Sequence, residues 1–154
     1  MTEPVHYRVD HRIPSTGIYR HLRQQAGLSI KSLEAAERGL PNSCFAVQIL
    51  AGDEVVGMGR VIGDGGCFYQ VVDIAVLPEH QGRGIGKMIM REISDYLERE
   101  VPDSAYVSLL ADGRANELYQ QFGFAPTAPA SIGMSLRKRS ASGAGDASPM
   151  FSTK

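Results

Sequence analysis

The chain has 154 residues, which is the usual size of one domain and leaves little room for a second. Hydrophobic residues make up 43% and charged residues 21%, an ordinary balance for a globular protein that argues against a disordered or membrane-embedded chain. The formal net charge of -1 gives no electrostatic reason to expect a nucleic acid or an anionic membrane as a partner.

Targeting and redox features are also missing from the sequence. The first residues contain no basic start followed by an apolar stretch, and no apolar run has membrane-spanning length, so we expect a cytoplasmic protein. Cys44 and Cys67 fit reduced thiols better than a disulfide framework. No Cys/His cluster has the spacing of metal ligands, so no metal is expected.

The first half of the chain predicts two helices and several antiparallel strands. Residues 7–9 fit an edge strand, residues 16–25 fit a helix, and Ser32 can cap a second helix that runs to Arg38. Further strands are expected over the ranges 45–50, 55–62 and 67–76. The first two flank the turn 51–54, and a glycine-rich turn at 63–66 leads into the third, so all three should pair antiparallel.

The second half predicts a strand, helix, strand unit. Apolar residues fall at helical spacing from Ile85 to Leu97. A strand is expected at 105–110, a helix at 114–121 and a last strand at 132–136, while the small, polar residues 140–154 predict a disordered tail. A right-handed crossover would pair the strands 67–76 and 105–110 in parallel.

A glycine-rich loop joins the strand at 67–76 to the following helix. Its glycines allow the backbone to approach a ligand, and the free N–H groups of the helix start would face anionic oxygens. The spacing excludes a Walker loop, because Met88 stands where Ser or Thr is required, and it also excludes the dinucleotide fingerprint. The candidate pyrophosphate-binding residues are Gln81, Gly82, Arg83, Gly84, Ile85, Gly86 and Lys87.

A second motif lies at residues 111–124, where ADGRANELYQQFGF predicts a helix that carries Asn116 and Tyr119 and ends in a Gly-Phe turn. With Gln81-x-x-Gly84-x-Gly86, the chain resembles the GCN5-related N-acetyltransferase (GNAT) superfamily, whose Gln/Arg-x-x-Gly-x-Gly/Ala signature binds acetyl-coenzyme A. The resemblance covers residues 44–138 and is weak over the first forty.

The resemblance implies a fold and a co-substrate. We expect a single α/β (α+β) domain over residues 1–139, with a central mixed, mostly antiparallel twisted sheet, helices on both faces and a splayed parallel strand pair. Acetyl-CoA would be the acetyl donor. The backbone of Ile74, Ala75 and Val76 would pair with its pantetheine arm, and Asn116 would hydrogen-bond that arm. Tyr119 would protonate the leaving thiolate, the alternative being a core tyrosine with a wet hydroxyl.

The general base is less well indicated. Asp73 is the only acid in an apolar strand, where a carboxylate is costly unless it is paired or functional. It is therefore the candidate base, or a place to hold a cationic amine, and pairing with a basic side chain across the sheet is the alternative. Histone-modifying members have a Glu where this chain has Gln70, which argues against their mechanism. A water chain ending at Asp73, Glu79 or His80 is another proton route.

The acceptor pocket should be formed by the N-terminal helices and the loop 27–31, together with Tyr69 and Asp112. We expect direct acetylation of a small primary amine, held partly by Asp73 or Asp112, rather than of a nucleic acid, a phosphate sugar or a histone tail. Acetylation of a protein lysine or N-terminus and a non-catalytic acyl-CoA-binding module are the alternatives. A homodimer and the use of other acyl groups are left open.

Overall fold

The structure is a computed structural model that describes residues 3–138, so the tail expected at 140–154 lies outside the described residues. Residues 3–124 belong to one compact unit, and residues 125–138 belong to a second. The predicted domain end at residue 139 stays a prediction.

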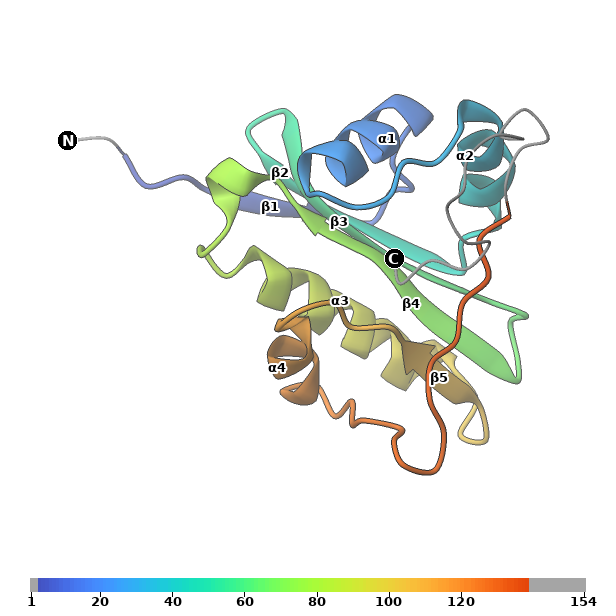
Figure 1. Ribbon diagram of the computed structural model, residues 1–154. Coiled ribbons are helices and arrows are strands. Elements are labelled where there is room, and N and C mark those ends of the chain that lie inside the picture. The colour runs from blue at the N-terminus through green and yellow to red at the C-terminus, as the bar shows by residue number, and fades with distance from the viewer. Residues whose placement is uncertain (1–2, 139–154) are drawn as a thin grey trace. The chain divides into compact units, whose positions relative to one another are not determined.

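A five-stranded mixed sheet organises the first unit (Figure 1). The strands lie side by side in chain order; the first four are antiparallel, and the fifth runs parallel to the fourth. This confirms the predicted antiparallel strands and the predicted parallel pair. The strands are β1 (Tyr7–Asp10), β2 (Phe45–Ala51), β3 (Glu54–Gly63), β4 (Phe68–Val76) and β5 (Tyr106–Leu109).

Helices cover both faces of this sheet, as expected (Figure 1). One face carries the two N-terminal helices, α1 (Thr16–Gln25) and α2 (Leu33–Gly39), and the other carries α3 (Ile85–Glu100) and α4 (Ala115–Gln120). Short 3-10 turns, η1 (Leu40–Asn42) and η2 (Pro78–His80), follow α2 and β4. The hydroxyls of Ser15 and Ser32 cap α1 and α2. Within residues 3–138, no helix is both long enough and apolar enough to cross a membrane.

Two glycines of β3 bring α3 close to the sheet. A Cβ on Gly59 would lie 2.6 Å from Ile89 and 2.8 Å from Ile74, and one on Gly57 would lie 2.9 Å from Ile85. The helix can settle on the strand only because these side chains are absent. This packing sets the start of α3 beside the end of β4.

A β-bulge interrupts the pairing of β3 with β4. Gly59 is the one residue between the pairs Met58↔Ala75 and Arg60↔Val72, whereas β4 has two residues there, Asp73 and Ile74. Asp73 has a φ of 60° and is the one non-glycine residue of the described chain with a positive φ. Aspartate tolerates this left-handed conformation better than most residues. Bulges of this kind redirect side chains and interrupt the ladder.

Strands β4 and β5 part after four paired positions. The parallel register runs from Phe68↔Tyr106 to Val71↔Leu109, and β4 then continues to Val76 with no partner strand on that edge among residues 3–138. The expected splayed pair is therefore present. It leaves one edge of the second half of β4 open to a ligand.

The prediction of a strand at 132–136 is wrong, because residues 125–138 form turns and irregular structure. Ile132, Met134 and Leu136 are exposed. Alternating apolar residues supply a face, but a strand exists only where a neighbouring strand completes its hydrogen bonds. Pro126 and Pro129, which cannot donate such bonds, stand just before the segment.

Candidate functional site

The N-terminus of α3 forms an open cradle of backbone N–H groups. Gly84 caps the helix with a φ of 83°, Gly82 has a φ of 77°, and a Cβ on either would meet no atom within 4 Å. The first helical bond runs from Met88 N to Gly84 O, so the N–H groups before it have no acceptor in the helix. An anionic pyrophosphate fits the free donors and the positive end of the helix dipole.

Other residues of the loop position this cradle. Gln81 Nε2 donates to the carbonyl oxygen of Val76 over 3.1 Å, which ties the loop to the end of β4. Arg83 donates to the hydroxyl of Tyr7, and that hydroxyl lies 2.8 Å from His80 Nδ1. His80 is thus a turn residue beside the cradle.

Gly86 has a packing role in addition to the ligand role that the sequence predicts. A Cβ there would lie 3.1 Å from Leu118 Cδ2 on α4. The third glycine of the motif therefore allows α3 and α4 to approach each other, which sets the position of the helix that carries Tyr119.

A cavity of about 530 Å³ opens along β4. It gathers side chains from α1, β3, β4, β5 and α4, and it includes five of the residues singled out in the sequence: Gln70, Asp73, Ile74, Asp112 and Tyr119. Leu28 and Lys31 of the loop 27–31 also line it, as expected. Tyr69, in contrast, is buried in the core and does not line the cavity. Asn116 is exposed on α4, one turn before Tyr119.

Tyr119 is the residue of α4 that brings a hydroxyl group to the lining of this cavity. Its side chain is only 8% exposed, and burial, followed by the negative charge of Asp112, raises its pKa above the ordinary value of 10.0. The hydroxyl is therefore protonated at neutral pH. This state is the one that a proton donor requires.

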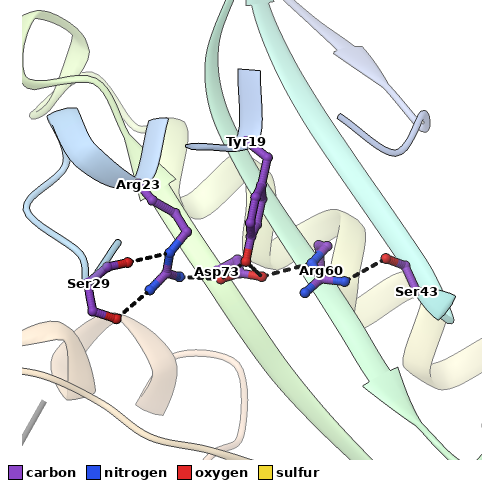
Figure 2. A network of polar contacts seen from close by, with 6 residues as sticks. All are labelled: Tyr19, Arg23, Ser29, Ser43, Arg60 and Asp73. Carbon is purple, nitrogen blue, oxygen red and sulfur yellow. Dashed lines mark hydrogen bonds and ion pairs between the residues drawn. The ribbon is translucent and has the colours of Figure 1, made fainter. Parts of the chain in front are cut away.

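The cavity lining also holds a buried ionic cluster centred on Asp73 (Figure 2). Arg60 Nε donates to Asp73 Oδ2 over 2.8 Å, Arg23 Nη1 donates to Asp73 Oδ1, and the hydroxyl of Tyr19 lies 3.1 Å from both oxygens. The side chains of Asp73, Arg23 and Arg60 are 5%, 9% and 10% exposed. Asp73 therefore pairs with basic side chains, which is the alternative that the sequence left open.

Serines and an aromatic ring hold the two arginines in place. Arg23 donates to the carbonyl oxygen and the hydroxyl of Ser29, and Arg60 Nη1 donates to Ser43 Oγ over 2.8 Å. Both guanidinium groups also lie over the ring of Tyr19, at 5.9 Å and 5.4 Å from its centroid. Burial, and next the charge of Asp73, raise the pKa of Tyr19, so its hydroxyl stays neutral and donates.

Sequence analysis missed Tyr19, Arg23 and Arg60 as site residues. Arg60 carried a usable signal, because it is the only charged residue inside the apolar run 55–62, just as Asp73 is in its own strand. Two opposite charges in neighbouring buried strands indicate a pair. Arg23 carried no such signal, because arginine is common on an exposed helix face.

Comparison with known proteins agrees with this geometry. The family profile of the acetyltransferase (GNAT) domain matches residues 41–126, more than half of the chain. The chain therefore belongs to the GNAT acetyltransferase family.

Named relatives cover only parts of the chain. It is 32% identical over 72 residues to the chloroplastic GCN5-related N-acetyltransferase 2 of Arabidopsis thaliana, which is 46% of this chain and 27% of that protein. It is 29% identical over 109 residues to an uncharacterized N-acetyltransferase of Prochlorococcus marinus, which is 67% of this chain and 58% of that protein. The chain thus spans less than two thirds of the length of these relatives.

Solved structures cover more. A protein of unknown function from meticillin-resistant Staphylococcus aureus is 48% identical with a TM-score of 0.83, over 86% of this chain and all of that one. A GNAT-family acetyltransferase from Streptococcus pneumoniae is 28% identical with a TM-score of 0.71, over 88% of this chain and all of that one.

Proposed function

We propose that this protein is an N-acetyltransferase that moves an acetyl group from acetyl-CoA directly to a primary amine of a small molecule. One observation carries the proposal: the unpartnered edge of β4 runs from the α3 cradle to the cavity that Tyr119 lines. A ligand with a pyrophosphate at one end and a thioester at the other matches this arrangement. The cradle would hold the pyrophosphate, and the free backbone of Ile74, Ala75 and Val76 would pair with the amide groups of the pantetheine arm.

The chemistry requires a nucleophilic amine and a proton for the leaving group. The amine nitrogen attacks the thioester carbon, the C–S bond breaks, and the sulfur takes a proton from the hydroxyl of Tyr119. The proton lost by the amine leaves through solvent and restores the neutral tyrosine. Burial keeps the Tyr119 hydroxyl protonated until that step. Asn116 would hydrogen-bond the pantetheine arm.

The surroundings of Asp73 favour a positioning role over that of a general base. Its two carboxylate oxygens receive two guanidinium contacts and the hydroxyl of Tyr19. A carboxylate that is engaged in this way has little capacity left to accept a proton or to hold a cationic amine. We therefore propose that Asp73 orients Arg23 and Arg60, which departs from the role that the sequence suggested.

A thiol-release assay with acetyl-CoA and a panel of amines tests the proposed function. We expect acetyl-CoA to raise the melting temperature and at least one small amine to be acetylated. Tyr119→Phe should lower kcat by about a hundredfold or more while the affinity for acetyl-CoA stays the same. Tyr96→Phe, the same change at an α3 residue stacked on Phe45, is the matched control.

Three outcomes would contradict the proposal. Absence of a thermal shift at millimolar acetyl-CoA would remove the cradle assignment. Binding without turnover of any amine or peptide would indicate an acyl-CoA-binding module. A lysine peptide preferred over every small amine by its kcat/KM would move the acceptor to protein.

A further inference from the structure

We propose that the acceptor carries an acidic group, a carboxylate or a phosphate, in addition to its amine, and that Arg60 binds this group. The inference rests on the proposed function, since it specifies the acceptor of the same cavity. It replaces a simple amine held by carboxylates with a molecule that has opposite charges at its two ends.

Among residues 3–138, the buried ionic cluster contains two positively charged side chains and one negatively charged side chain. Two guanidinium groups, from Arg23 and Arg60, share the single carboxylate of Asp73, and both arginines are buried. A buried cation without a counter-ion is costly, because the charge has lost its water. The ring of Tyr19 offsets part of this cost, but it is neutral. A bound anion would balance the charge.

Arg60 has donors left for such an anion. Its Nε is used by Asp73 and its Nη1 by Ser43, whereas Nη2 makes no hydrogen bond within residues 3–138 (Figure 2). The two N–H groups of Nη2 can therefore donate hydrogen bonds to a ligand from a buried guanidinium that Asp73 and Ser43 hold in place. Arginine binds carboxylates and phosphates in this way, with charge-assisted hydrogen bonds of defined direction.

Arg60 also lines a side compartment. It has a volume of about 150 Å³ and shares Tyr19, Lys31 and Arg60 with the main cavity. Ala35, Ala36, Gly39 and Leu40 of α2 and the following turn form the rest of its wall, and none of its described lining residues is acidic. The volume suits an acidic group with a few carbon atoms. A protonated amine or a polyamine would be repelled there.

Another part of the cavity lining has the opposite charge. Asp112 lines it near Tyr119, close enough for its negative charge to act on the tyrosine. The cavity is therefore negative where the proton donor lies and positive at Arg60. An amine at the Tyr119 end and an acidic group at the Arg60 end would satisfy both, so the matching class is a small amino acid or an amino phosphate.

Matched acceptor pairs test this inference. We would measure kcat/KM by thiol release for glycine, β-alanine and γ-aminobutyrate against alkylamines in which a methyl group replaces the carboxyl. O-phosphoethanolamine against ethanolamine forms the phosphate arm, and 1,3-diaminopropane the cationic one. The acidic member of at least one pair should be preferred by about tenfold or more. The arm that shows the preference identifies carboxylate or phosphate.

Arg60→Gln should abolish this preference, and Arg60→Lys should recover part of it, because a lysine keeps the charge but not the planar donors. Arg91→Gln, the same loss of charge at an exposed α3 residue on the other face of the sheet, should leave the preference unchanged. The thermal shift with acetyl-CoA reports whether each variant is folded.

The results separate this inference from the proposed function. Turnover of neutral amines without preference for any acidic partner overturns the inference and leaves the acetyltransferase intact. An equal fall in kcat for acidic and neutral amines in Arg60→Gln also overturns it, because the arginine then acts on the reacting acetyl group. Calorimetric binding of N-acetyl-β-alanine against N-propylacetamide needs no turnover, and equal affinities there would reject the anion site even if no amine were acetylated.

Discussion

Replacing Asp73 with Asn should destabilise the protein more than any other single change of a carboxyl to an amide. The substitution keeps the shape of the side chain, and Asn tolerates the left-handed backbone at this position, so the change is mainly one of charge. It leaves Arg23 and Arg60 buried side by side without a carboxylate. In addition, the new amide nitrogen is a donor that faces other donors.

The structure allows the size of this effect to be worked out. Asp73 is 5% exposed and receives charge-assisted bonds from two arginines, and removal of one partner from a buried ion pair costs about 3–5 kcal/mol. For a chain of this length, each kcal/mol corresponds to about 2–4 °C in melting temperature. The expected fall is therefore about 6–20 °C.

Urea unfolding and thermal melts of Asp73→Asn would measure the loss. Glu34→Gln is the matched control, because Glu34 forms a salt bridge with Arg38 that is fully on the surface and should contribute nothing measurable. If unpaired positive charge causes the loss, adding Arg60→Gln to Asp73→Asn should cost less than the sum of the two single changes, by about 0.5–3 kcal/mol. A single-variant loss below about 1 kcal/mol, or strict additivity, would refute the reasoning.

Three further predictions concern the cradle, the packing of β3 and the proton donor. Gly84→Ala and Gly52→Ala should each lower the free energy of unfolding by about 1–2 kcal/mol, because both glycines have a positive φ and open space around them. Only Gly84→Ala should also lose the thermal shift with acetyl-CoA. An undiminished shift in Gly84→Ala would mean that this loop does not bind the ligand. Gly59→Ala should cost about 1–3 kcal/mol through its contacts with α3 and Ile74. Gly17→Ala, in the first turn of α1 with open space around it, should instead stabilise the protein by up to about 1 kcal/mol. Urea titrations that gave no loss for Gly59→Ala would mean that the sheet relaxes around the added methyl group. Because burial raises the pKa of Tyr119 above 10.0, the loss of kcat on the alkaline side should begin only above pH 10 and should be missing in Tyr119→Phe. The stability linked to the neutral tyrosine is complete below pH 10, and it declines as the pH rises through the folded-state pKa. A decline of kcat below pH 9 that persists in Tyr119→Phe would assign that limb to another group.

The sequence by itself determined most of the helices and strands and the glycine-rich start of α3. Helix starts at Ser15 and Ser32, the hairpin around Gly52 and the glycine-rich entry to α3 depend on a few neighbouring residues, whose conformational preferences are local. For the same reason the N–H groups before Met88 could be placed without knowledge of the rest of the fold.

Only the tertiary structure decided which distant residues meet. Residues 132–136 alternate as a strand would, but the alternation does not say whether a neighbouring strand is present to accept their hydrogen bonds. The sequence predicts a ligand role for Gly86, and only the structure shows that Leu118 on α4 also packs against this position.

The charge of the acceptor cavity also depends on long-range contacts. Asp73 was found as an isolated acid in an apolar strand, but its partners come from α1 and β3, which lie 50 and 13 positions away in the chain. Whether a buried charge is a base, a clamp for an amine or a member of an ion pair depends on what the fold places within about 4 Å of it. Asp73 alone suggested a negatively charged pocket. Its pairing with Arg23 and Arg60 makes the cavity positively charged near Arg60 instead.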